Sequence, residues 1–145
     1  MKNFKLAKRG FTLIETVLVL AIGLGLIVGG IVFFQQAQAS SDLTDKTRSA
    51  VGISSEVRSQ YRTAANFGAA DADIKEDVMT SSSIPEAQFN NVAIAVGADP
   101  QEFVLTFSAL NEKVCNRMAS SDLGPNSASD DADCANGNLA VTYSR

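Results

Sequence analysis

The chain has 145 residues, of which 46% are apolar and 19% charged, a composition that fits one folded domain and argues against general disorder. Twelve Lys and Arg against sixteen Asp and Glu give a net charge of −4, which offers nucleic acid no general attraction. Histidine is absent and only two cysteines are present, so His-based catalysis, imidazole zinc sites and four-thiolate metal sites are excluded. We therefore expect no enzyme, no cofactor and no metal.

The N-terminus combines a basic segment with a long apolar one. Residues 1–10 contain four cations and no acid: Lys2, Lys5, Lys8 and Arg9. Residues 11–34 contain one charge, Glu15, and the nineteen residues from Thr16 to Phe34 contain none. A helix of that length spans roughly 28 Å, close to the hydrocarbon thickness of a bilayer. The basic side is expected to stay in the cytoplasm, with the rest of the chain outside.

Several interpretations of this segment stay open. A cleaved secretory signal would end at the A-x-A-like residues 37–39, although the apolar stretch exceeds the usual length of roughly 7–15 residues. A plain membrane anchor leaves Glu15 unexplained, because a carboxylate within a membrane helix costs a few kcal/mol and usually has a partner. Thr12 and Glu15 also fit a capping box, which requires a helix start near Thr12. Cleavage between Gly10 and Phe11 would create that start, together with an ammonium four residues before the carboxylate.

The string Lys8-Arg9-Gly10-Phe11-Thr12-Leu13-Ile14-Glu15, followed by its apolar run, resembles the class III leader of type IV pilins and the related pseudopilins. The resemblance covers about the first 35 residues. It implies that a prepilin peptidase cleaves between Gly10 and Phe11 and methylates the new amine of Phe11. It also implies that Glu15, with Thr12 beside it, pairs with the N-terminus of an adjacent subunit during assembly.

The family likeness implies an α+β pilin fold and three regions: a cleaved leader (1–10), an apolar transmembrane and assembly helix (11–35) and a globular head (36–145). The expected function is that of a structural type IV pilus subunit, held in the bacterial inner membrane before the pilus assembly machinery adds it to an extracellular filament. Filaments of identical subunits in this family serve adhesion, aggregation or motility. A pseudopilin of a type II secretion system, a minor pilin, or a secreted domain released after Ala39 are the alternatives. Residues 11–145 carry eight basic and sixteen acidic residues, a net charge of −8, so direct nucleic-acid binding is not expected.

A cluster of glycines interrupts the apolar run at Gly23, Gly25, Gly29 and Gly30. Gly25 and Gly29 match the small-residue motif of membrane-helix packing. Each glycine also weakens a helix by about 0.8–1 kcal/mol relative to alanine. Many pilins carry a helix-breaking proline where this chain has Val32, and our hypothesis is that the glycine cluster supplies the flexibility instead.

Helical periodicity continues beyond the apolar run. The residues at steps of three and four are Leu43, Thr47, Ala50, Ser54, Val57 and Tyr61. They predict one helix from about Phe11 to Ala65, either packed on the head or exposed like a coiled coil. Residues 66–89 are expected to be a loop region, containing a short helix that Asp71 caps and that runs through Met79, with Ile74 and Val78 facing inward. The acids of this stretch lack the EF-hand spacing, so we expect no calcium site there.

The C-terminal half predicts an antiparallel sheet over 91–107 and 138–143. Strands over 91–96 and 102–107 flank a five-residue loop and form a hairpin, in which Phe103, Leu105 and Phe107 share one face. A helix is expected from Ser108 through Met118.

The two cysteines, Cys115 and Cys134, bound the polar residues 120–133, which we interpret as a loop that cannot fold alone. A disulfide between them would close a loop of about 20 residues and stabilise the fold by roughly 3 kcal/mol, and two free thiols are the alternative. Region 115–134 resembles the disulfide-bounded region of type IV pilins, where it faces the filament exterior.

Overall fold

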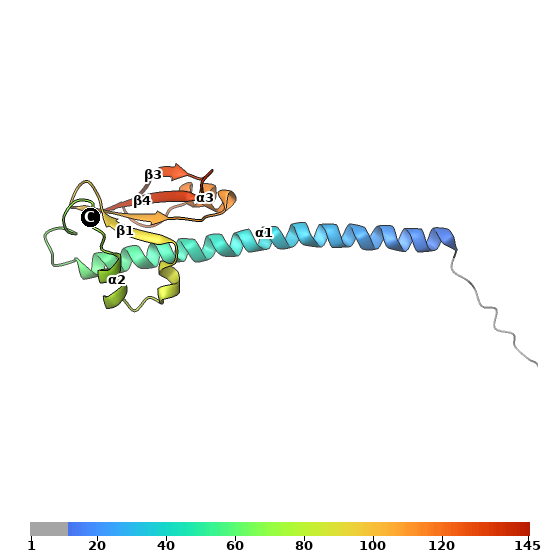
Figure 1. Ribbon diagram of the computed structural model, residues 1–145, viewed down its shortest axis with the longest axis horizontal. Coiled ribbons are helices and arrows are strands. Elements are labelled where there is room, and N and C mark those ends of the chain that lie inside the picture. Colours follow the sequence, from blue (N-terminus) through green and yellow to red (C-terminus); the bar gives the residue numbers. More distant parts are fainter. Residues whose placement is uncertain (1–11) are drawn as a thin grey trace, which may run out of the picture. The chain divides into compact units, whose positions relative to one another are not determined.

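The computed structural model of the chain describes residues 12–145, apart from the side chain of Asp130. It has the expected α+β class, with a long N-terminal helix and a small antiparallel sheet (Figure 1). In chain order the elements are α1 (Leu13–Gln60), α2 (Lys75–Ser81), the 3-10 helix η1 (Glu86–Phe89), β1 (Val92–Val96), β2 (Glu102–Phe107), α3 (Glu112–Ala119), β3 (Ser127–Asp133) and β4 (Asn138–Ser144). The chain divides into two compact units between Ala37 and Gln38, and α1 contributes residues to both.

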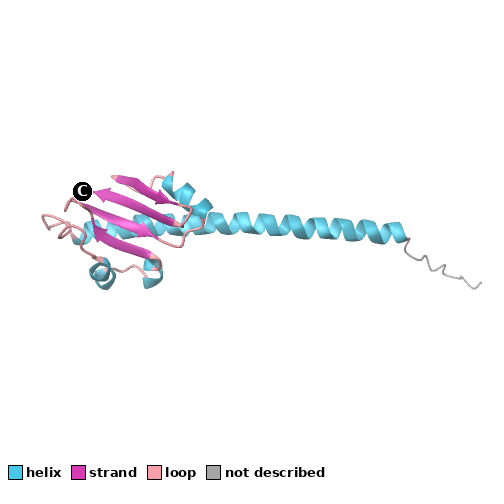
Figure 2. Cartoon of the chain, turned by 45° about the horizontal axis from the view of Figure 1, so that its top comes forward, coloured by secondary structure: helices cyan, strands magenta, loops and turns pink. Residues whose placement is uncertain are grey.

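The second unit, Gln38–Arg145, contains a four-stranded sheet in the order β1-β2-β4-β3, and every neighbouring pair of strands is antiparallel (Figure 2). The predicted hairpin is confirmed, because β1 pairs with β2 up to Val96 and Phe103 across a five-residue loop. The predicted inward face of β2 is confirmed as well, since Phe103, Leu105 and Phe107 are fully buried. The alternation of apolar residues therefore determined which face of the hairpin meets the core.

The core of this unit lies between the sheet and the second half of α1. Ala50, Ile53 and Val57 of α1 are fully buried and belong to one apolar cluster with the inward residues of the strands. Their spacing of three and four places them on one helix face, as the periodicity predicts. The outer edge of β1 is covered by residues 71–74, where Ile74 N donates to Ile94 O at 3.0 Å and Asp73 forms a bridge with Ala95.

Two helix boundaries in the first half of the head differ from the sequence prediction. α1 ends at Gln60 and not at Ala65: Arg62 N and Ala64 N donate to carbonyls only three residues back, and the side chain of Arg145 donates to the carbonyls of Tyr61 and Ala65. The short helix spans Lys75–Ser81 and not Asp71 to Met79, because Asp71 takes a left-handed φ of 60°. Ile74 and Val78 are buried as predicted. The region 66–89 also contains η1, which the sequence pattern did not indicate.

The helix predicted from Ser108 begins only at Glu112. Ala109 has a φ of 58° and breaks the helical geometry, and the side chain of Asn111 accepts a hydrogen bond from Lys113 N at 3.0 Å, which caps the helix. The segment before the cap is held by a hydrogen bond at Leu110, whose N donates to Gly137 O at 2.9 Å. Gly137 permits this approach, because its φ is +72° and a Cβ there would lie 2.6 Å from Leu110 O.

The polar stretch predicted as a loop contains β3. Residues 127–133 pair with β4, with a shift of register between Ala128 and Asp131. Their composition gave no strand signal, because the segment lacks a period-2 apolar pattern, and in the structure no described side chain of β3 is buried.

Candidate functional site: the exposed apolar helix

The described residues of α1 up to Ala37 present apolar side chains on every side. All fifteen large apolar residues from Leu13 to Phe34 are more than half exposed, ranging from 52% at Val32 to 83% at Leu13. A helix that is apolar all round is normally buried in protein or lipid. The stretch is long and apolar enough to cross a membrane by length and composition.

Thr12 and Glu15 lie at the start of this helix. α1 begins at Leu13, and Thr12 O accepts hydrogen bonds from Glu15 N at 3.0 Å and from Thr16 N at 3.3 Å. Glu15 is exposed and lies in the first turn, where a carboxylate interacts favourably with the helix dipole. The start at Leu13 fits the capping-box spacing of Thr12 and Glu15. Gly10 and Phe11, the predicted cleavage and methylation sites, lie outside the described residues.

The four glycines are all within α1, and a Cβ added at any of them would meet nothing within 4 Å. Packing among the described residues therefore does not require glycine at Gly23, Gly25, Gly29 or Gly30. Their absent side chains leave shallow places on the helix surface, where another helix can approach closely. The proposed flexibility of this cluster concerns the assembled state and stays a prediction.

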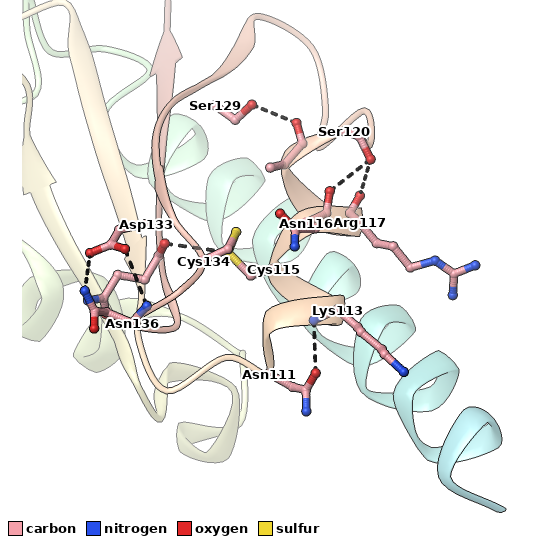
Figure 3. The surroundings of a disulfide bond; sticks show 12 residues. Asn111, Lys113, Cys115, Asn116, Arg117, Ser120, Ser129, Asp133, Cys134 and Asn136 are labelled. Carbon is pink, nitrogen blue, oxygen red and sulfur yellow. Dashed lines mark hydrogen bonds between the residues drawn. A yellow bond between two sulfur atoms is a disulfide. The ribbon is translucent and has the colours of Figure 1, made fainter. Parts of the chain in front are cut away.

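The predicted disulfide is present and joins Cys115 of α3 to Cys134, the residue that follows β3 (Figure 3). Cys115 is fully buried, whereas Cys134 keeps 9% of its surface exposed. Around the bond, Ser129 Oγ donates to Ala119 O at 2.8 Å, and Asn136 Nδ2 donates to Asp133 Oδ2 at 2.8 Å (Figure 3). The first contact joins β3 to the end of α3 and the second lies within the turn between β3 and β4, so both are within the second unit.

Of the acids in the 71–77 stretch, Asp73 has a local structural role. Asp73 Oδ1, and not Asp71, accepts a hydrogen bond from Lys75 N at 2.9 Å at the start of α2. Among the residues that the structure describes, no group of three His, Cys, Asp or Glu side chains is placed to hold a metal ion. The feature of the described chain that most needs a partner is therefore the apolar part of α1.

The chain was compared with protein-family models, with curated proteins and with solved structures, and none of them matches it.

Proposed function

We propose that this chain is the structural subunit of a type IV pilin-like filament and that it polymerises through the apolar part of α1. The observation that carries the proposal is the exposure of all fifteen large apolar side chains from Leu13 to Phe34 in the single chain. Removing apolar surface from water is favourable by about 25 cal/mol per Å². This segment is therefore expected to function in apolar surroundings and not in water. Lipid surrounds the apolar segment before assembly, and copies of the same helix surround it afterwards.

Glu15 gives the proposal its specificity. An exposed carboxylate at the start of an apolar helix is costly once the helix enters lipid or a helix bundle, unless a cation pairs with it. Cleavage after Gly10 would supply such a cation as the amine of Phe11. The pairing of this amine with Glu15 of a neighbouring subunit then makes assembly depend on cleavage.

The head supports the same proposal. It is α+β, its core includes one face of the long helix, and a disulfide bounds its C-terminal region. This architecture is compatible with a pilin head. In the finer form of this proposal the chain is a type IV pilin, exported to an extracellular filament. A pseudopilin would instead be required for the export of another protein and would not form long surface fibres.

Substitution of Glu15 tests the proposal. Glu15→Ala is expected to leave membrane insertion intact, because it removes a charge from an apolar helix, and to reduce the yield of sheared filaments at least about tenfold. Asp42→Ala is the matched control, since Asp42 is an exposed acid of the same helix outside the apolar stretch. Filament yield, measured by electron microscopy and quantitative blotting, should be unchanged by the control.

The mass of the mature N-terminus separates the proposal from a secreted domain. A chain that begins at methylated Phe11 supports the filament subunit, and one that begins at Ser40 supports release after Ala39. Normal filament yield from Glu15→Ala, or an uncut leader in purified filaments, would refute the assembly mechanism.

A further inference from the structure

β3 is the outermost strand of the sheet and contributes no described side chain to the core. Its sequence, Ser-Ala-Ser-Asp-Asp-Ala-Asp, lacks the β-branched and aromatic residues that favour strands. The ladder to β4 is also interrupted between Ala128 and Asp131. Neither side-chain burial nor local propensity therefore explains why this segment stays paired.

The two ends of the segment are instead bonded to other parts of the head. Before β3, Arg58 Nη2 donates to Pro125 O and Tyr143 Oη donates to Leu123 O at 3.1 Å. After β3, Cys134 is bonded to Cys115 in α3, which is itself held in the core by Val114 and Met118. Between these hydrogen bonds and the disulfide, the Oγ of Ser129 donates to Ala119 O.

From this arrangement we infer that the Cys115–Cys134 disulfide keeps β3 in place as a removable cover over the edge of β4. Reduction by a dithiol transfers two electrons and two protons to the pair, which gives two thiols and leaves the reductant as a disulfide. One closed loop of 20 residues then becomes open, because the cysteines are 19 positions apart. The entropy of that loop favours separation of β3 from β4 by about 100-fold.

The edge that β3 covers is suited to pairing. β4 has the sequence Asn-Leu-Ala-Val-Thr-Tyr-Ser, with buried Leu139, Val141 and Tyr143 alternating along it. Its other neighbour, β2, pairs with it over six residues without a register shift. An uncovered β4 edge is a template to which a strand of a second copy can add. The disulfide thus controls whether this sheet edge is closed.

The experiment is residue-resolved hydrogen exchange by NMR on the full chain in detergent micelles, before and after reduction with dithiothreitol. Successive amides of β4 point alternately to β3 and to β2. After reduction, the amides that point to β3 should exchange about 10- to 100-fold faster, and those that point to β2 should change less than about threefold. Cys115→Ser combined with Cys134→Ser should show the same alternating pattern without reductant and no response to it.

Two results would overturn the inference. Unchanged exchange along β4 after reduction would show that backbone pairing alone holds β3. Equal acceleration of both sets of β4 amides, together with those of Phe103 and Leu105 in β2, would show that the bond supports the whole head. Because the readout lies entirely in the second unit, it is independent of filament formation, and either outcome leaves the Glu15 test to be judged separately.

Discussion

Tyr143 shows how one buried residue connects several elements of the head. Its ring stacks on Phe103 with centroids 5.1 Å apart, and the guanidinium of Arg58 lies 5.7 Å from its ring centroid. Burial raises the pKa of Tyr143 to about 12, and a weaker contribution from Asp122 acts in the same direction. A hydrogen bond with Ser54 and the charge of Arg58 lower this pKa but do not cancel the effect of burial.

The raised pKa of Tyr143 makes stability depend on pH in the alkaline range. The neutral phenol is favoured in the folded state, so its contribution is complete below the unfolded pKa of 10.0 and is lost as the pH rises through about 12. The loss is expected to reach about 2–3 kcal/mol. Tyr143→Phe should cost about 1 kcal/mol below pH 10, since it removes the hydrogen bond to Leu123 O, and should flatten the decline above pH 10.

Denaturant unfolding at several pH values between 8 and 11.5 measures this effect. Tyr61→Phe is the comparison, because burial and the charge of Asp77 also raise the pKa of Tyr61, but its side chain is only half-buried. An equally steep alkaline decline in Tyr143→Phe and in the parent chain would contradict the assignment.

Among the elements, hydrogen bonds from two arginines connect the end of α1 with the end of β4. The guanidinium of Arg145 donates to the carbonyls of Tyr61 and Ala65, both at 2.9 Å, and lies 5.8 Å from the ring centroid of Phe67. In the opposite direction, Arg58 Nη2 of α1 donates to Ser144 O at 3.0 Å. Arg58 therefore links the last turn of α1 to the end of β4, and Arg145 satisfies carbonyls of the segment that directly follows α1.

Arg145→Ala is expected to destabilise the head by about 1–2 kcal/mol, because several hydrogen bonds from one charged donor are lost at an exposed position. Hydrogen exchange should accelerate in the last turn of α1 more than in β2. Arg117→Ala, which removes an exposed cation from α3, should change the free energy of unfolding by less than about 0.5 kcal/mol. Equal effects of the two substitutions would contradict the proposed capping role.

At the scale of the whole molecule, the two units differ in what they require. The buried apolar core lies entirely within Gln38–Arg145, and the partly buried residues packed against it begin at Ala39. The described residues before Gln38 bury no large apolar side chain. The head can therefore fold without burying the apolar helix. Burial of that helix requires lipid or other copies of the chain.

A chain beginning at Gln38 is accordingly expected to fold cooperatively and to remain monomeric in buffer without detergent. A chain beginning at Phe11 should require detergent or form assemblies, because its fifteen large apolar residues between Leu13 and Phe34 stay exposed. Sedimentation velocity and circular dichroism check both statements. An unfolded or aggregated product from the shorter chain would show that the head needs the apolar segment.

The elements that the sequence predicted well are those whose signal is local. The long apolar run and the three-four spacing through Val57 predicted the helix, and strict alternation in Glu102–Phe107 predicted β2 with its observed bounds. The apolar segment and its single carboxylate were likewise visible without any structure. The disulfide rested on the count of two cysteines and on their place around a polar stretch.

Contacts between residues distant in the chain decided the rest. The segment after α1 is bonded by Arg145, about 80 positions away, and the segment before α3 is bonded at Leu110 to Gly137. β3 has no strand signal of its own, pairs with the edge of β4 and is followed directly by the disulfide-bonded Cys134. The sequence by itself thus determined which side chains must leave water, since hydrophobicity is a property of each residue. Only the tertiary structure decided where elements end and which strand covers which edge, because backbone groups take whichever partner the folded chain brings within hydrogen-bond distance.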